Sequence, residues 1–264
     1  MVSHLGPRLC LLAGLLIAGC GDDRATEALR LLEFRQLDFD AVALNEELLF
    51  YFSSDLERSS VTDESVRVLD PEGREVRGEH SVRGNALSFR PALPKEPDLS
   101  DGGFRPGLRY QVRLGGFPRP DGLRSKSGAV LSASLLLNFK TVEVGQGPLF
   151  LDPGRGPFRL LPRGRQVGPM LVELEEGRIV LEHGEALDPT SVPSAQFELV
   201  RFGTGLRETG ERVPVVPVLV ENHRDHAELV LEPRSAAGEP LVGLPPGTYF
   251  LTLLNRDLRT LGGR

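Results

Sequence analysis

The chain has 264 residues and a formal net charge of −6, with acidic and basic residues mixed along its length. No block of lysine and arginine with interleaved aromatic residues occurs, which argues against nucleic acid as a partner. The 21 prolines and 30 glycines favour many short strands joined by turns over a helical fold, and the length suits two domains.

Residues 1–19 have the features of a secretory signal peptide. Arg8 supplies a positive charge, and Leu9 to Ala18 form an apolar run. This run is too short to cross a bilayer as a mature helix, which needs about 20 apolar residues. Small residues then precede Cys20. An ordinary signal peptide with a chance cysteine near its cut site is the alternative interpretation.

The Ile17-Ala18-Gly19-Cys20 motif resembles a bacterial lipobox. The resemblance implies cleavage before Cys20, lipidation of this cysteine and attachment to a membrane through the lipid, with 20–29 as lipidated cysteine and tether. Glycine rather than aspartate follows Cys20, and by resemblance to the enterobacterial sorting pattern this points to the outer membrane. Cys10 leaves with the signal peptide, so no disulfide is expected.

Alternating apolar residues predict strands in residues 30–144. The strongest pattern lies in Glu47 to Phe52, where Leu48 and Phe50 share one face with Phe52. In chain order, the predicted strands cover 29–37, 47–52, 66–68, 75–77, 86–89, 110–114 and 135–139. Turn-forming residues separate them, and this series is typical of an Ig-like sandwich.

A glycine- and proline-rich stretch at 145–156 predicts a linker, after which the strand pattern starts again in residues 157–264. The predicted strands cover 179–181, 197–201, 213–220, 229–231 and 249–253. Pro214 and Pro217 mark 213–220 as an edge strand. The sequence therefore predicts an all-β fold of two tandem antiparallel β-sandwiches.

The two halves share motifs in the same order, which indicates a domain duplication. Leu56 with Ser60-Val61 matches Leu187 with Ser191-Val192. Pro106-Gly107 before Tyr110 matches Pro246-Gly247 before Tyr249.

Both halves resemble bacterial Ig-like domains of the surface-layer (SbsA-like) type. The first copy carries the motif series as Phe52-Ser53, Leu56, Ser60-Val61, Phe89-x-Pro91, Pro106-Gly107-x-x-Tyr110, Asp121-Gly122 and Phe139-x-Thr141. The resemblance covers 30–144 well and 157–264 less fully.

The second copy departs from the family pattern in two ways. His183 stands where Phe52 stands in the first copy, and no counterpart of Leu135 to Thr141 follows Gly262-Gly263-Arg264. We therefore expect an unpaired sheet edge in the second sandwich. Truncation, divergence, compensation by the first strand and a strand donated by a partner are the explanations left open.

Residues with possible chemistry are few. One cluster contains side chains that can ligate a metal, His223-Arg224-Asp225-His226. It offers too few ligands for a metal site, and a hairpin tip is predicted there. His183 is expected to be a hydrogen-bonded histidine at the core edge. Asp98 and Asp101 share a loop without the ligand spacing of a Ca²⁺ site, and Gly203-Thr204-Gly205 is predicted to be a turn.

The sequence contains no nucleophile elbow, Walker loop, His-Glu-x-x-His or paired-cysteine motif. Tyr110 and Tyr249 are predicted to lock the sandwiches in the manner of a tyrosine corner. We predict no catalytic residue, no cofactor and no metal.

These features together predict a non-catalytic, lipid-anchored protein of the bacterial cell envelope that displays Ig-like structural or adhesive modules. The alternative is a binding module for an envelope polysaccharide or a protein partner, with loops 92–105 and 118–128 as the contact surface. An accessory role to a hydrolase is a third and weaker hypothesis.

Overall fold

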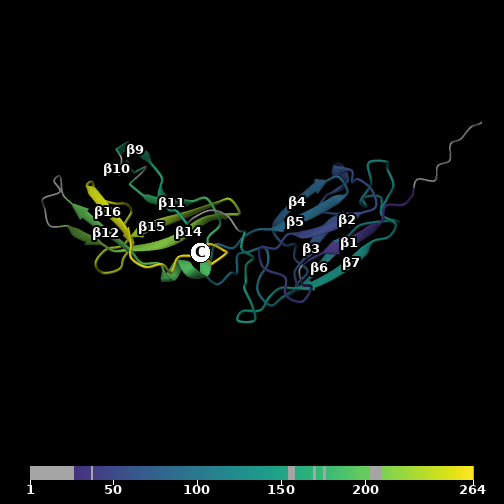
Figure 1. The fold of residues 1–264 in the computed structure, drawn as a ribbon, viewed down its shortest axis with the longest axis horizontal. Helices are drawn as coiled ribbons and strands as arrows, with labels where there is room; N and C mark the ends of the chain where they lie inside the picture. The colour runs from purple at the N-terminus through teal and green to yellow at the C-terminus, as the bar shows by residue number, and fades with distance from the viewer. Residues whose placement is uncertain are drawn as a thin grey trace, which may run out of the picture.

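A computed structural model describes residues 27–36, 38–153, 158–168, 171–174, 177–202 and 210–263. These residues form sixteen strands and two short 3₁₀ helices, so the chain is an all-β protein, as predicted. Strands β1 to β7 gather in one lobe and the later strands in a second lobe, with the C-terminus between the two lobes (Figure 1). The named strands pair in antiparallel fashion, and the sheets pack as Ig-like β-sandwiches.

The first lobe contains two sheets that face each other, ordered β1-β2-β5-β4 and β3-β6-β7. Their strands are β1 (Leu31–Arg35), β2 (Leu48–Phe52), β3 (Val66–Leu69), β4 (Gly78–Arg83), β5 (Ala86–Pro91), β6 (Arg109–Leu114) and β7 (Leu135–Lys140). A 3₁₀ helix, Arg58–Ser60, connects β2 to β3.

The second lobe contains sheets ordered β14-β15-β11-β8 and β13-β12-β16, with a small β10-β9 ladder beside them. Their strands are β8 (Leu161–Pro162), β9 (Arg165–Gly168), β10 (Leu171–Glu173), β11 (Ile179–His183), β12 (Phe197–Phe202), β13 (Glu211–Val213), β14 (Val215–His223), β15 (His226–Pro233) and β16 (Thr248–Leu253). A 3₁₀ helix, Pro189–Ser194, precedes β12. No strand is predicted from the sequence at β8, β9 or β10, which are two to four residues long.

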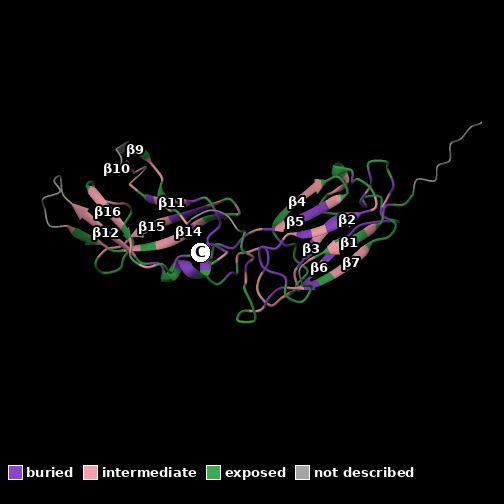
Figure 2. Ribbon diagram, viewed as in Figure 1, coloured by how far each residue is buried: buried purple, intermediate pink, exposed green. Residues whose placement is uncertain are grey.

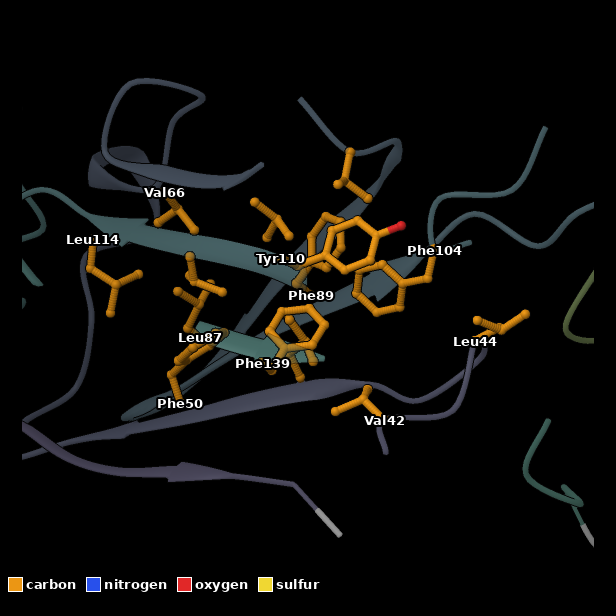
Figure 3. Packing of buried hydrophobic residues seen from close by; sticks show 14 of the residues in the cluster. Val42, Leu44, Phe50, Val66, Leu87, Phe89, Phe104, Tyr110, Leu114 and Phe139 are labelled. Carbon is orange, nitrogen blue, oxygen red and sulfur yellow. The ribbon is translucent and has the colours of Figure 1, made fainter. Parts of the chain in front are cut away.

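The core of the first lobe is aromatic and follows the alternation in the sequence. Along the strands, buried and more exposed residues alternate (Figure 2). Phe104 lies beside Tyr110 and Phe139 in the cluster that Figure 3 shows, with ring centroids 5.0 Å from Tyr110 and 5.2 Å from Phe139. A separate cluster of mainly aliphatic residues, including Leu181, fills the second lobe.

The strand predicted at 75–77 is wrong. Glu75 makes only an isolated bridge to Leu69, and the strand that pairs with β5 is β4, three residues further on. Gly78 is the first residue of this strand, and an added Cβ there would lie 2.4 Å from the ring atom Cζ of Phe89, so the position needs a residue without a side chain. The two-residue turn Gly84-Asn85, with Gly84 at φ 60°, then connects β4 to β5.

The strand predicted at 213–220 is an edge, as expected, but it is divided between two sheets at Pro214. β13 pairs with β12, whereas β14 pairs with β15 in the other sheet. Pro214 has no backbone N–H to donate to a ladder, so the chain can change sheets there without losing a hydrogen bond. Both halves are edge strands of their sheets.

The outer edge of β16 differs from that of β6, the corresponding strand of the first lobe. There, β7 pairs with β6, and the inward-facing Tyr110, Val112 and Leu114 are at most 2% exposed. In the second lobe, no strand within the described ranges pairs with the outer side of β16. Tyr249 and the inward-facing leucines of β16 are only half-buried.

The stretch predicted as a linker, 145–156, contributes two residues, Leu149 and Phe150, to the first core. Phe150 is buried in that cluster and Leu149 packs against it. The side-chain amide of Asn45 donates to the carbonyl of Leu151 and its oxygen accepts from the Leu151 N–H, at 2.8 and 2.7 Å. Within the described ranges, no helix has the length and apolar character needed to cross a bilayer.

Candidate functional site

Two of the predicted sites lie outside the described residues. These are Cys20, with the signal peptide and lipid attachment, and the turn at Gly203-Thr204-Gly205. The prediction for Cys20 therefore depends on the sequence motif alone.

The two loops predicted to form one contact surface lie at opposite ends of the first lobe. Loop 92–105 lies at the beginning of β6, where the N–H of Arg105 donates to the hydroxyl of Tyr110 at 2.7 Å. Loop 118–128 lies at the other end, where the N–H of Leu123 donates to the carbonyl of Gly115 at 2.8 Å. At about 3.4 Å per residue, β6 separates them by roughly 17 Å.

Loop 92–105 is also less polar than its sequence suggests, and part of it is covered. Leu93, Leu99 and Phe104 are buried in the first core. The carbonyl oxygen of Pro94 accepts a hydrogen bond from the second lobe. The two loops therefore do not form one continuous contact surface, because they lie at opposite ends of the first lobe and loop 92–105 contacts the second lobe at Pro94.

The junction is centred on Asn222, which is 5% exposed and lies at the end of β14. Its side-chain amide donates to the carbonyls of Pro94 and Leu187 at 2.7 and 3.0 Å, and its side-chain oxygen accepts from the Leu187 N–H at 2.9 Å. One buried amide thus connects a loop of the first lobe to two elements of the second. No motif in the sequence marked Asn222 for this role.

Charged and apolar groups extend the junction. Glu47 of the first lobe is partly buried, which favours its neutral form, but hydrogen bonds from Ser88 and Arg90 and the positive charge of Arg224 in the second lobe hold its pKa below the usual value. Ala186 and Leu261 of the second lobe belong to the buried cluster of the first. The junction therefore has polar, charged and apolar parts.

The predicted hairpin tip at 223–226 is present, and His226 at its end forms a cluster with two nearby glutamates, Glu221 and Glu228. Arg224 and Asp225 form the turn between β14 and β15. His226 Nε2 lies 3.0 Å from Glu228 Oε1 and 4.0 Å from Glu221 Oε2. Ligand atoms of these three residues lie within 4.8 Å of one another. Glu221 and Glu228 share a face because they are register partners.

Arg163 balances the charge beside this cluster. Glu182 is the register partner of Glu228 on its other side, so three carboxylates lie in a row across β14, β15 and β11. The guanidinium of Arg163 forms ion pairs with Glu182 and Glu228. Because like charges directly opposite each other destabilise a sheet, we assign Arg163 a structural role as their counter-ion.

His183 and the two tyrosines make hydrogen bonds to the backbone. His183 is 4% exposed, and its Nδ1 lies 2.7 Å from the carbonyl oxygen of Arg159. The hydroxyl of Tyr249 donates to the carbonyl of Pro245 at 2.5 Å, four residues upstream, much as Tyr110 contacts the backbone of Arg105. Burial raises the pKa of both tyrosines.

Asp98 and Asp101 cap turns within their own loop. Asp98 Oδ1 accepts from the Ser100 N–H at 3.0 Å, and this hydrogen bond lowers the pKa of Asp98. Asp101 Oδ1 accepts from the N–H groups of Lys95 and Glu96 at 3.0 and 2.9 Å. Both carboxylates thus satisfy backbone donors of the loop.

His80 is a half-buried titratable group on the edge strand β4. It lines a pocket of about 430 Å³ together with Arg58 and Arg83. Its ring packs against Phe89 at 5.0 Å between centroids, and its Nε2 has no hydrogen-bond partner among the described residues. Burial lowers the pKa of His80, although the negative charge of Asp63 opposes this.

The free energy of unfolding is expected to fall as the pH drops below about 6.5, the ordinary pKa of histidine. Below this pH, the unfolded chain binds a proton at His80, whereas the folded chain binds it only at a lower pH. The free energy of unfolding therefore keeps falling until the pH is below the pKa of His80 in the folded state. Denaturant unfolding of His80→Gln at pH 7.5 and 5.5 should show a smaller difference than the wild type. The exposed His223→Gln is the control, and an unchanged difference in His80→Gln would contradict the assignment.

No protein-family model matches the chain, and no curated protein matches it. Among solved structures, it is similar to native alpha-2-macroglobulin from Escherichia coli over domains MG0-NIE-MG1, with 12% identity and a TM-score of 0.38, covering 87% of this chain and 67% of that chain. It is also similar to the N-terminal part of the bacterial S-layer protein SbsC, with 10% identity and a TM-score of 0.31, covering 78% and 44%.

A second SbsC structure, of domains 1–6, is 7% identical with a TM-score of 0.32, and the match covers 83% of this chain and 34% of that chain. The chain thus spans less than half the length of each S-layer structure. At these identities and TM-scores, the similarities assign no function.

Proposed function

We propose that this chain is a non-catalytic, lipid-anchored module of the bacterial cell envelope, in which two Ig-like sandwiches form a stiff structural or adhesive display unit. Residues 30–144 and 157–264 are its two domains, and the lipid on Cys20 attaches it to a membrane, with the outer membrane favoured by Gly21.

The observation that carries this proposal is the junction at Asn222. At a flexible linker, the lobes would make few contacts and the polar groups between them would stay exposed to water. A polar group that is buried must instead find a hydrogen-bond partner. Here, Asn222 is buried and makes hydrogen bonds on both sides of the junction. A chain whose lobes are held together in this way suits a spacer that keeps a fixed length and orientation.

Anchoring is tested by expressing the full chain in a bacterium that processes lipoproteins, with a clickable fatty acid in the medium. The wild type is expected to incorporate the label and to fractionate with membranes, whereas Cys20→Ala should lose the label. Cys10→Ala is the matched control, because Cys10 lies in the predicted signal peptide. Equal labelling of Cys20→Ala and the wild type, or a label lost in Cys10→Ala as well, would contradict anchoring through Cys20.

A further inference from the structure

Two arginines lie directly opposite each other on the outer face of the β3-β6-β7 sheet. Arg67 on β3 and Arg113 on β6 are register partners. Their strand neighbours Val66 and Leu114 are buried in the core, so the pleat directs the two arginine side chains away from it. Like charges directly opposite on adjacent strands destabilise a sheet, so this pair calls for a compensating group.

A pocket of about 210 Å³ lies at this pair, at the end of β6. Its charged lining consists of Arg67, Arg113, Arg119 and Glu64, and its remaining lining includes Leu135, Leu136 and Ser134. Leu136 on β7 is the register partner of Arg113 and is 57% exposed. The pocket thus combines guanidinium groups with an exposed apolar side chain.

The arginine pair has little internal compensation. Arg67 Nε is buried and has no hydrogen-bond partner among the described residues. Arg113 Nε donates to the neutral Gln111 Oε1 at 2.8 Å. Arg119 is different, because Asp121 pairs with it through both carboxylate oxygens. Asp121 neutralises the charge of Arg119. The two positive charges of Arg67 and Arg113 and the negative charge of Glu64 then leave the pocket with a net charge of +1.

We propose that this pocket binds a phosphate group, held between the guanidinium groups of Arg67 and Arg113. Guanidinium groups bind such oxyanions through paired, charge-assisted hydrogen bonds. An anion between the two arginines would offset their mutual repulsion. Glu64 acts against the anion and limits its affinity.

The position of the pocket indicates the source of the phosphate. The chain enters the first lobe at this same end, where the N–H of Leu29 donates to the carbonyl of Val130 at 3.1 Å and the N–H of Ser132 to the carbonyl of Leu29 at 2.8 Å. Fully extended, the tether from Cys20 to Leu29 reaches roughly 30 Å. Given the proposed lipid anchor, on which this step depends, the pocket lies close enough to meet a lipid headgroup.

The test uses the full chain with Cys20→Ala in every arm, so that a lipid on Cys20 does not itself drive membrane binding. Inorganic phosphate is titrated by calorimetry and by its effect on the melting temperature. We expect saturable binding with a stabilising shift, since a ligand of the folded state stabilises it. The double variant Arg67→Gln/Arg113→Gln should bind at least tenfold more weakly, and Glu64→Gln more tightly.

Arg109→Gln is the matched control, because Arg109 lies exposed on the same strand at its other end. The double variant is expected to be at least as stable as its parent without phosphate, since it removes a like-charge pair. Absence of saturable phosphate binding in the parent, or equal binding in the double variant, would overturn the proposal.

Binding to vesicles of phosphatidylglycerol and of phosphatidylcholine is measured to distinguish a lipid headgroup from a soluble phosphate as the source of the phosphate group. Binding to phosphatidylglycerol vesicles that is lost in the double variant assigns the site to a lipid headgroup. Phosphate binding without vesicle binding supports the pocket but assigns it to a soluble phosphate and overturns the headgroup assignment. Because Cys20 is replaced in all arms, fatty-acid labelling of the unmodified chain tests the anchor separately.

Discussion

Replacing Phe104 with alanine is expected to lower the free energy of unfolding of the first lobe by about 3–5 kcal/mol. Phe104 is fully buried, and its ring lies between those of Phe89, Tyr110 and Phe139, at 6.1, 5.0 and 5.2 Å between centroids. Its removal would leave a cavity that these rings cannot fill without leaving their own positions. Guanidinium chloride unfolding of Phe104→Ala and the wild type measures the loss.

Phe117→Ala is the control for this experiment, since Phe117 is 68% exposed. A change within about 0.5 kcal/mol is expected there. A loss below about 1 kcal/mol in Phe104→Ala would show that loop 92–105 does not belong to the core, contrary to the packing in Figure 3.

Asn222→Ala is expected to have the second largest effect, a loss of about 2–4 kcal/mol, because it leaves buried backbone groups without partners. The carbonyl of Pro94 and the N–H and carbonyl of Leu187 each lose a hydrogen bond. Since Pro94 lies in the first lobe, the coupling between the lobes should also weaken. Small-angle scattering should show a wider distribution of distances between them, and unfolding should separate into two transitions.

Asn138→Ala serves as the control, because Asn138 is exposed and makes only a weak contact, 3.5 Å between its Oδ1 and Gln111 Nε2. We expect neither a change in scattering nor a second transition in this variant. An Asn222→Ala protein with the scattering curve of the wild type would contradict the proposed role of the junction.

Local patterns were enough to place most of the first lobe. Leu48, Phe50 and Phe52 alternate with less buried residues, and the structure buries all three. Apolar alternation does not predict the strand β4, because its sequence, GEHSVR, has no regular apolar pattern. The Gly84-Asn85 turn that follows it was the available signal, since this pair is typical of a two-residue hairpin.

The candidate sites depend on pairings that local patterns do not specify. Val66-Arg67-Val68 and Val112-Arg113-Leu114 each place an arginine on the outer face, but only the sheet register brings the two together. In the same way, Asn222 and Pro94 are distant in sequence, and no periodicity connects them. A period of two determines the face of a side chain and leaves its cross-strand partner open.

The path of the chain through the first lobe affects how this lobe bears tension. Leu29 lies at one end, paired in parallel with Leu131, whereas Val42 pairs in parallel with Thr141 and the chain leaves at the opposite end through residues 142–153. A pull between the two ends is therefore directed along the strands, so hydrogen bonds such as Val42 N–H to Lys140 carbonyl, 2.9 Å long, are loaded together in shear. Unzipping would instead break them one at a time. The first lobe is thus arranged to resist stretching along its length.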